Sequence, residues 1–273
     1  ALLRREAPLG RIDDIERVHP ESHVQAILDS IPEEGLRRID ADTAVCPGSG
    51  EAALRAVGAV ISAVDAVMTD EADNAFCAVR PPGHHAEPAQ AMGFCLFNNV
   101  AIAAEYARAR YGLERVAVMD FDVHHGNGTE AMFRDQPGLF YASTHQSPLY
   151  PGTGDPAETG VAGNILNVTL PPHAGGEAFR AAVTEKVLPA LRDFDPQLLL
   201  VSAGFDAHIR DPLAQLGLED GDYGWVTRQL LEVALDCCEG RLVSALEGGY
   251  DLSALATASA AHVRALLAVN DKG

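Results

Sequence analysis

The sequence predicts an α/β fold of three layers (α/β/α), in which helices cover both faces of a central, mainly parallel β-sheet. Short apolar runs of strand length alternate with longer segments in which alanine, leucine and valine recur at helical spacing. The strand-like runs are continuously apolar, as expected for strands buried on both faces. The chain has 273 residues, of which 47% are apolar, and shows no repeat, low-complexity tract or long linker. We therefore expect one domain over residues 1–273.

The expected elements alternate between helix and strand. A helix over 51–68 follows the glycine-rich turn at 47–50, and a short buried strand over 75–79 comes next. An alanine-rich helix over 99–110 ends near Gly112, because glycine commonly terminates helices. The remaining expected elements are strands over 115–119, 139–143, 165–170, 198–202 and 242–246, and helices over 178–191, 225–238 and 254–269.

Charge and cysteine content narrow the class of protein. The formal net charge of −19 argues against direct nucleic-acid binding, which needs clustered lysine and arginine. No apolar run reaches the length of about 18 residues that a membrane span requires, and the N-terminal residues do not form a secretory signal. An odd number of cysteines without metal-ligand spacing indicates reduced thiols, and hence a cytoplasmic protein. These cysteines are Cys46, Cys77, Cys95, Cys237 and Cys238.

Polar clusters follow five of the expected strands directly. In open α/β sheets, ligands bind beyond the carboxyl ends of the strands, so these clusters are predicted to meet at one edge of the sheet. They are RPPGHH at 80–85, DFDVHHGNG at 120–128, THQSPLYPGTG at 144–154, AGFDAH at 203–208 and EGGYD at 247–251.

Two acids and a histidine after the strand over 115–119 indicate a metal site. Alternate residues of an extended chain share one face, so Asp120, Asp122 and His124 are expected to point the same way. Crowded carboxylates repel each other unless a cation lies between them. Asp122, His124 and Asp206 together offer two oxygens and one nitrogen, which is the ligand pattern of catalytic zinc with an open fourth position. The alternative for any one of them is a hydrogen-bonded acid or a buried structural histidine.

The tandem His84–His85 and Tyr250 are candidate catalytic residues. A hydrolytic metal site needs a general base and a general acid, and two histidines can share these roles when different partners set their protonation states. Asp120 would orient one ring, and the neutral Asn127 would leave the other less basic. The Tyr250 hydroxyl would donate to an oxyanion. The alternatives are a surface loop for the histidines and an ordinary turn for Gly-Gly-Tyr.

The ordered motifs resemble those of a known family. RPPGHHAEP, GFCLFNN, DFDVHHGNGTE, STHQSPLYPGTG, SAGFDAH and LEGGYD are similar to successive signature segments of the zinc-dependent histone deacetylase and acetylpolyamine amidohydrolase superfamily. IERVHPESHVQAIL resembles its N-terminal region, so the likeness runs from about Ile15 to about Ser253. Asn127 and the segment GFDAH are most similar to those of the class II-like histone deacetylase-like amidohydrolases. The resemblance implies an arginase/deacetylase-like fold with a strand before Ala1.

The resemblance also implies a role for each site residue. Asp122, His124 and Asp206 correspond to the ligands of one zinc ion per chain. His84 and His85 correspond to the acid/base pair with Asp120 and Asn127 behind them, and Tyr250 to the oxyanion donor. Gly93 would accept the substrate amide proton, and Phe94 and Tyr150 would wall a narrow tunnel, Tyr150 standing where phenylalanine is usual. A structural potassium site would draw on Asp120, Asp122, His124, Ser143 and Thr144.

The predicted function is therefore zinc-dependent hydrolysis of N-acetyl-lysine amides in proteins or peptides. Acetylpolyamines and other small amides or esters are the alternative substrates. Polyamine-selective relatives carry a glutamate after the Asp-Pro that follows the last zinc ligand, whereas this chain has Leu213 there. Arginase-like enzymes need a second acid two residues after Asp206, and the chain has His208. A non-catalytic acyl-lysine-binding module would have lost Tyr250 or a ligand. Homo-oligomers are left open.

Overall fold

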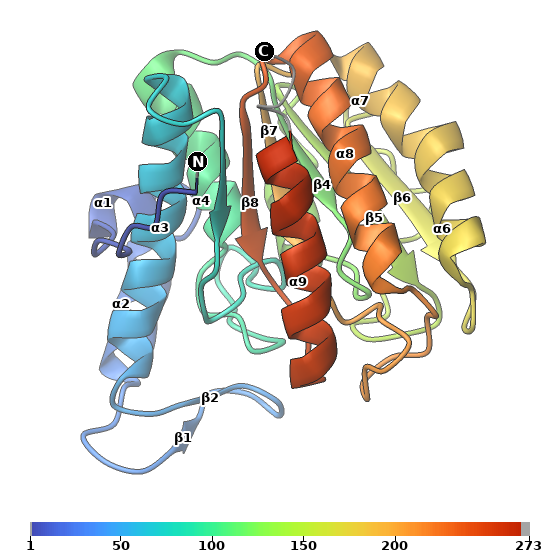
Figure 1. Ribbon diagram of the computed structural model, residues 1–273. Coiled ribbons are helices and arrows are strands. Elements are labelled where there is room, and N and C mark those ends of the chain that lie inside the picture. Colours follow the sequence, from blue (N-terminus) through green and yellow to red (C-terminus); the bar gives the residue numbers. More distant parts are fainter. Residues whose placement is uncertain (1, 269–273) are drawn as a thin grey trace.

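The protein is built on a sheet of six parallel strands in the order β3–β8–β7–β4–β5–β6 (Figure 1). The computed structural model describes residues 2–268. Every neighbouring pair in the sheet is parallel, which confirms the predicted α/β class. The strands are β3 (Asn74–Cys77), β4 (Val116–Asp120), β5 (Leu139–Gln146), β6 (Ile165–Leu170), β7 (Leu198–Ala203) and β8 (Leu242–Leu246).

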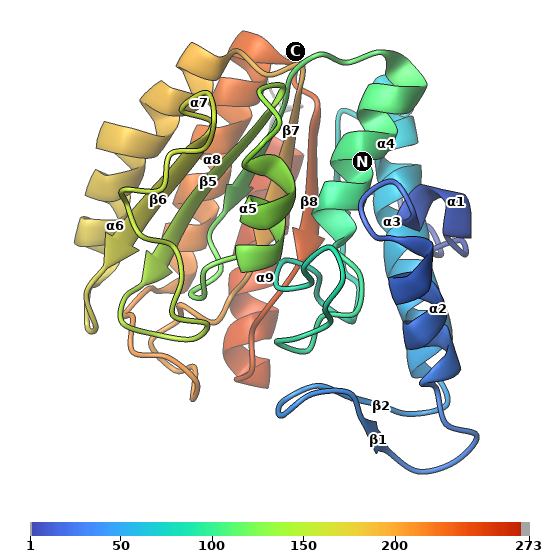
Figure 2. The same cartoon turned by 180° about the vertical axis from the view of Figure 1, so that it is seen from behind.

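Helices cover both faces of this sheet and complete the three layers. One face carries α6 (Gly176–Ala182), the π-helix η1 (Val183–Val187), α7 (Leu188–Phe194), α8 (Asp220–Cys237) and α9 (Leu252–Leu267) (Figure 1). The opposite face carries α3 (Ser49–Met68), α4 (Asn99–Tyr111) and α5 (Asn127–Phe133) (Figure 2). Among the helices of residues 2–268, none has the length and apolarity that crossing a membrane requires.

The period of two along each strand explains why the sheet needs helices on both sides. Val116 and Val118 of β4 belong to an apolar cluster with α3 and α4, whereas Ala117 and Met119 belong to a second cluster with α8. All five residues of β4 are buried, as are all six of β7. The continuous apolar runs seen in the sequence are therefore the central strands of the sheet.

An N-terminal part lies against α3 and α4. It contains α1 (Ile12–Ile15), α2 (Glu21–Asp29) and the two-stranded antiparallel pair β1 (Arg37–Arg38) and β2 (Ala44–Val45). Two stacked histidines connect it to the segment at 88–98. The ring nitrogens of His19 lie 3.0 Å from the Pro88 carbonyl and 2.9 Å from the Asn98 amide nitrogen, and His23 Nε2 lies 3.0 Å from the Leu96 carbonyl. The N-terminal helices thus brace the loop that carries Gly93 and Phe94.

The structure differs from the sequence expectations at several boundaries. The helix expected over 178–191 is three consecutive pieces, α6, η1 and α7. The strand expected over 139–143 continues to Gln146, because its last residues pair with β6 and the Gln146 amide donates to the Val123 carbonyl. The helix α5 was not expected. The last predicted helix begins at Leu252 and is described as far as Leu267, while its expected end at 269 lies outside the described residues.

Candidate active site

Asp122, His124 and Asp206 meet at the carboxyl edge of the sheet. Asp122 and His124 follow β4, and Asp206 follows the adjacent β7. One donor atom from each residue lies within 4.8 Å of the others, and all three side chains are largely buried. His124 Nδ1 is 3.0 Å from Asp122 Oδ1 and 3.1 Å from Asp206 Oδ2. The predicted convergence of these three residues is therefore present.

The donor set fits a metal ion. Burial and the neighbouring Asp122 charge raise the pKa of Asp206 to about 7, because two carboxylates face each other out of water. Within residues 2–268, neither carboxylate forms an ion pair with a lysine or arginine. Gly204 and Gly248 let the backbone approach closely, since a Cβ at either position would clash with Asp122 or Asp206. Two oxygens and one nitrogen around a single point suit zinc.

His84 lies in a strongly acidic environment. Its Nδ1 is 2.9 Å from Asp120 Oδ2, which also accepts a hydrogen bond from the Tyr141 hydroxyl at 3.0 Å. Burial lowers the pKa of His84, but the charges of Asp120, Asp122 and Glu247 outweigh burial and raise this pKa well above its ordinary value. These carboxylates therefore favour the protonated form of His84.

His85 lies in the opposite environment. Its ring centroid is 4.0 Å from that of His84, and its Nδ1 is 2.8 Å from the Asn127 side-chain oxygen. Burial and the positive charge of His84 hold the pKa of His85 well below its ordinary value. An amide oxygen only accepts, so Nδ1 carries the proton and Nε2 is free to accept one. The environments of the two histidines thus shift their pKa values in opposite directions, while their separate catalytic roles stay a prediction.

Glu247 binds the backbone that carries the two histidines. Its Oε2 accepts hydrogen bonds from the backbone amides of Gly83 and His84 at 2.6 and 3.1 Å, and its Oε1 accepts one from Ser202 at 2.9 Å. The side chain is buried, and burial raises its pKa to about 7. Its hydrogen bonds fix the backbone that carries both histidines.

The four predicted substrate-binding residues lie around the same edge. The Phe94 and Tyr250 rings are in edge contact at 5.8 Å between centroids, and Tyr150 makes a similar contact with His85 at 5.2 Å. Phe94, Tyr150 and Leu213 are 41, 39 and 47% exposed, which places them at a solvent-facing rim. Gly93 has a φ of +56°, and a Cβ there would clash with the His85 ring. Only glycine therefore fits beside the histidine.

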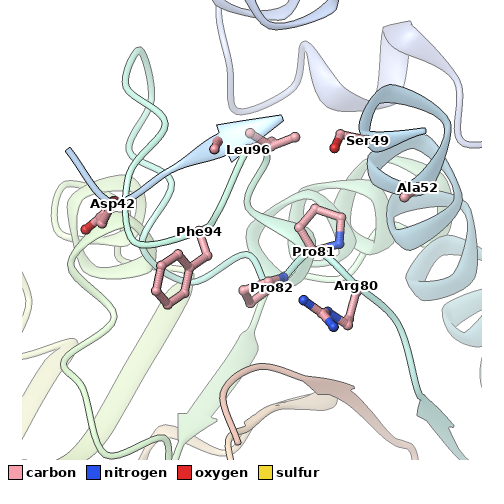
Figure 3. Close-up of a pocket in the computed structure, with 9 residues that line it drawn as sticks. Asp42, Ser49, Ala52, Arg80, Pro81, Pro82, Phe94 and Leu96 are labelled. Atoms are coloured by element: carbon pink, nitrogen blue, oxygen red, sulfur yellow. The ribbon is translucent and has the colours of Figure 1, made fainter. Parts of the chain in front are cut away.

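A cavity of about 370 Å³ adjoins this rim beside Phe94 (Figure 3). It lies between α3 and the loop that follows β3, and the metal donors are not part of its lining. Its labelled residues include two of opposite charge, Asp42 and Arg80, and the rigid pair Pro81–Pro82. Asp42 also contacts the segment that carries Gly93 and Phe94, since its Oδ1 accepts a hydrogen bond from the Gly93 amide at 3.2 Å.

The residues predicted to bind potassium lie on β4 and β5 and in the segment directly after β4. Asp120 of β4 is the register partner of Ser143 of β5, and Thr144 follows on β5. Asp122 and His124 continue the chain beyond β4. The five residues are thus brought together, but potassium itself stays a prediction.

Several site contacts were not identified from the sequence. The Tyr141 hydroxyl donates a hydrogen bond to Asp120. The sequence feature that could have identified it is a tyrosine inside an apolar strand, two residues before Ser143 and therefore on the same face. In the sequence, Glu247 stands out only because it directly precedes Gly-Gly-Tyr, and nothing there predicts its contacts with Gly83 and His84. The second histidine of the DVHHG motif, His125, has a structural role, because its ring nitrogens lie 2.9 Å from Glu130 Oε2 and 2.8 Å from Thr153 Oγ1.

The fold and site place the protein among the enzymes with a three-layer α/β/α fold whose active-site loops follow the carboxyl ends of a parallel sheet. The chain belongs to the histone deacetylase domain family, which matches residues 4–266, and is a hydrolase acting on amide bonds. It is 47% identical to an uncharacterized protein of Synechocystis sp., over 93% of this chain and 81% of that one. It is 44% identical to a histone deacetylase-like amidohydrolase of Pseudomonas aeruginosa, over 90% of this chain and 66% of that protein.

Solved structures agree with this assignment. The crystal structure of the HDA15 HD domain superposes with a TM-score of 0.91 at 34% identity, covering 97% of this chain and 75% of that one. The chain spans only about two thirds of the Pseudomonas protein's length. The specific substrates and partners of this chain are therefore a matter for proposal.

Proposed function

We propose that the protein hydrolyses the acetyl (acyl) amide of N-acetyl-lysine in proteins or peptides, with one zinc ion held by Asp122, His124 and Asp206. The observation that carries this proposal is a pair of stacked histidine rings beside a buried Asp–His–Asp donor set, one bonded to the Asp120 carboxylate and the other to the neutral Asn127 amide. Such a pair places a ring that can accept and return a proton beside a ring that keeps a positive charge, and amide hydrolysis requires this proton transfer.

Each side chain has a defined task in this reaction. Zinc, when bound, supplies Lewis acidity to the acyl carbonyl and acidifies the attacking water. His85 takes the proton of that water at Nε2 and later returns it to the leaving amine, while His84 stays charged. Tyr250 donates its hydroxyl to the oxygen that becomes negative. Gly93 presents its carbonyl to the substrate amide, and Phe94 and Tyr150 enclose the lysine methylenes. Acetate and a free amine are the products.

Removal of the metal is expected to abolish turnover of an acetyl-lysine peptide, because the carbonyl then loses its Lewis acid. Apo-protein prepared with a chelator would be assayed on a fluorogenic acetyl-lysine peptide before and after one equivalent of Zn²⁺. Recovery with Zn²⁺ and not with Mg²⁺ is expected, since magnesium prefers octahedral oxygen sites. Full activity of metal-free protein would contradict the proposal.

Two observations favour peptides over acetylpolyamines. Leu213 stands at the rim where an acidic side chain would attract a second amine, and it is apolar and 47% exposed. The cavity beside Phe94 gives room for residues flanking the acyl-lysine, which a small acetylated amine does not possess (Figure 3). The decisive comparison is kcat/KM for an acetyl-lysine peptide against acetylated putrescine and spermidine. A preference for the amines would support the alternative function.

Arg80→Ala is expected to raise KM for acetyl-lysine peptides about threefold, as loss of one hydrogen bond to a peptide carbonyl would. KM for acetylputrescine is expected to stay unchanged, because that substrate does not reach the cavity. The matched control is Arg228→Ala, since Arg228 is an exposed arginine on α8. Steady-state kinetics on both substrates measure the effect. Equal changes for both substrates would show that the cavity does not bind the peptide.

Potassium and cellular location complete the proposal. A structural K⁺ at Asp120 and Ser143 is supported by their pairing across β4 and β5. A cytoplasmic location is supported by the cysteines, all five of which are free thiols.

A further inference from the structure

Tyr250 is carried by a segment with little rigidity of its own. It follows Gly248 and Gly249, and Gly249 has a φ of +141°, which is open to glycine but rarely to other residues. An oxyanion donor is effective only when its hydroxyl is already in place before charge develops. The freedom of the two glycines must therefore be limited by contacts from elsewhere.

The segment before Tyr250 is held on the side of the metal donors. The Gly248 amide donates to Asp122 Oδ2 at 2.8 Å, and the Gly248 carbonyl accepts from the Phe205 amide at 2.8 Å. On its other side, Asp251 caps α9 by accepting from the Ala254 amide at 2.7 Å. These contacts fix the residues around Tyr250, but none of them involves the backbone of Tyr250 itself.

Asp211 supplies that contact. Its Oδ2 accepts a hydrogen bond from the Tyr250 amide at 2.7 Å, across 39 residues of chain. Its Oδ1 accepts one from the Leu213 amide at 2.9 Å, and its own amide donates to the His208 carbonyl at 2.8 Å. Asp211 is 7% exposed, so these bonds are shielded from water. One side chain thus ties the loop after β7 to the loop after β8.

We propose that Asp211 is a positioning residue, whose carboxylate holds Tyr250 in the donating position and locks it in register with the rim residue Leu213. This inference rests on the proposed role of Tyr250 as oxyanion donor. Asp211 does not touch the reacting atoms and acts only through Tyr250. Loss of the tether would leave substrate binding nearly intact while fewer molecules hold the hydroxyl in place, so kcat should fall more than KM rises.

A double-mutant cycle of Asp211→Asn and Tyr250→Phe tests this. Asparagine has the same shape but presents an N–H to one of the two amides, which leaves a buried donor unpaired. We expect Asp211→Asn to lower kcat about tenfold and to change KM by no more than about twofold, because the unpaired amide no longer holds Tyr250 in place. Tyr250→Phe alone is expected to lower kcat about 10²-fold. The double variant should equal Tyr250→Phe, because a displaced phenylalanine has no hydroxyl to lose.

The outcomes are distinguishable. If the two losses multiply in the double variant, Asp211 does not act through Tyr250, and the inference is overturned while the proposed function stands. If Tyr250→Phe is fully active, the oxyanion role itself is wrong. Asp236→Asn, at an exposed ion pair with Arg192, is the matched control and should leave activity unchanged. Thermal melting and zinc content verify folding; if Asp211→Asn does not fold, Asp211→Glu, which keeps two acceptors, takes its place in the cycle.

Discussion

Tyr250→Phe is expected to lower kcat on acetyl-lysine peptides by at least about 10²-fold, the loss seen when an oxyanion donor is removed. The substitution deletes one hydroxyl and leaves the ring, so the edge contact with Phe94 persists. Zinc stoichiometry should be unchanged, because Tyr250 lies outside the donor set. The measurement is steady-state turnover with metal analysis of the same preparation.

A matched tyrosine isolates the effect. Tyr106 is on α4, where its hydroxyl bonds to Asp65 at 2.9 Å, far from the sheet edge. Tyr106→Phe should lower the free energy of unfolding by roughly 1 kcal/mol and leave kcat unchanged. Near-wild-type turnover of Tyr250→Phe would show that its hydroxyl has no role in the reaction. An equal loss of kcat in Tyr250→Phe and Tyr106→Phe would indicate general destabilisation.

The fold was largely predictable because its central strands are continuously apolar. Runs such as Leu198–Ala203 have no polar face, and only a sheet covered on both sides buries them. The break at η1 and the helix α5 were not predictable in the same way. The apolar residues of η1 keep the spacing of an ordinary α-helix, so the sequence does not reveal the wider turn of the π-helix. In α5 the motif HHGNGTE carries site residues and glycines instead of a helical apolar stripe.

The site was predictable where residues adjoin in sequence or directly follow the carboxyl ends of the expected parallel strands, as Asp206 does. Alternation placed Asp120, Asp122 and His124 on one side of an extended chain. The residues that hold the site in place could not be predicted from sequence spacing. Glu247 contacts Gly83 across 164 residues, and this contact depends on the order of the strands in the sheet. Because β8 lies next to β3 in the sheet, the loop after β8 lies beside the loop after β3 that carries the histidines. Single-domain organisation and the residue roles stay predictions.

His85→Ala is expected to lose about 10³-fold in kcat and His84→Ala about tenfold less, within the usual range for general acid–base groups. The reason is the difference in their partners. His85 is the neutral ring with a free Nε2 that moves the proton, whereas His84, paired with Asp120, contributes its positive charge. His173→Asn, at an exposed histidine, is the control and should retain full activity.

The pH dependence separates the two histidines further. His85 acts as a base only when neutral, so kcat/KM should fall as the pH drops toward its lowered pKa. His84 contributes only when protonated, so kcat/KM should fall as the pH rises through its raised pKa. His84→Ala is therefore expected to lose the alkaline limb of the profile and keep the acidic one. Identical profiles and equal losses in the two variants would mean that Asp120 and Asn127 do not divide the histidines into charged and neutral forms.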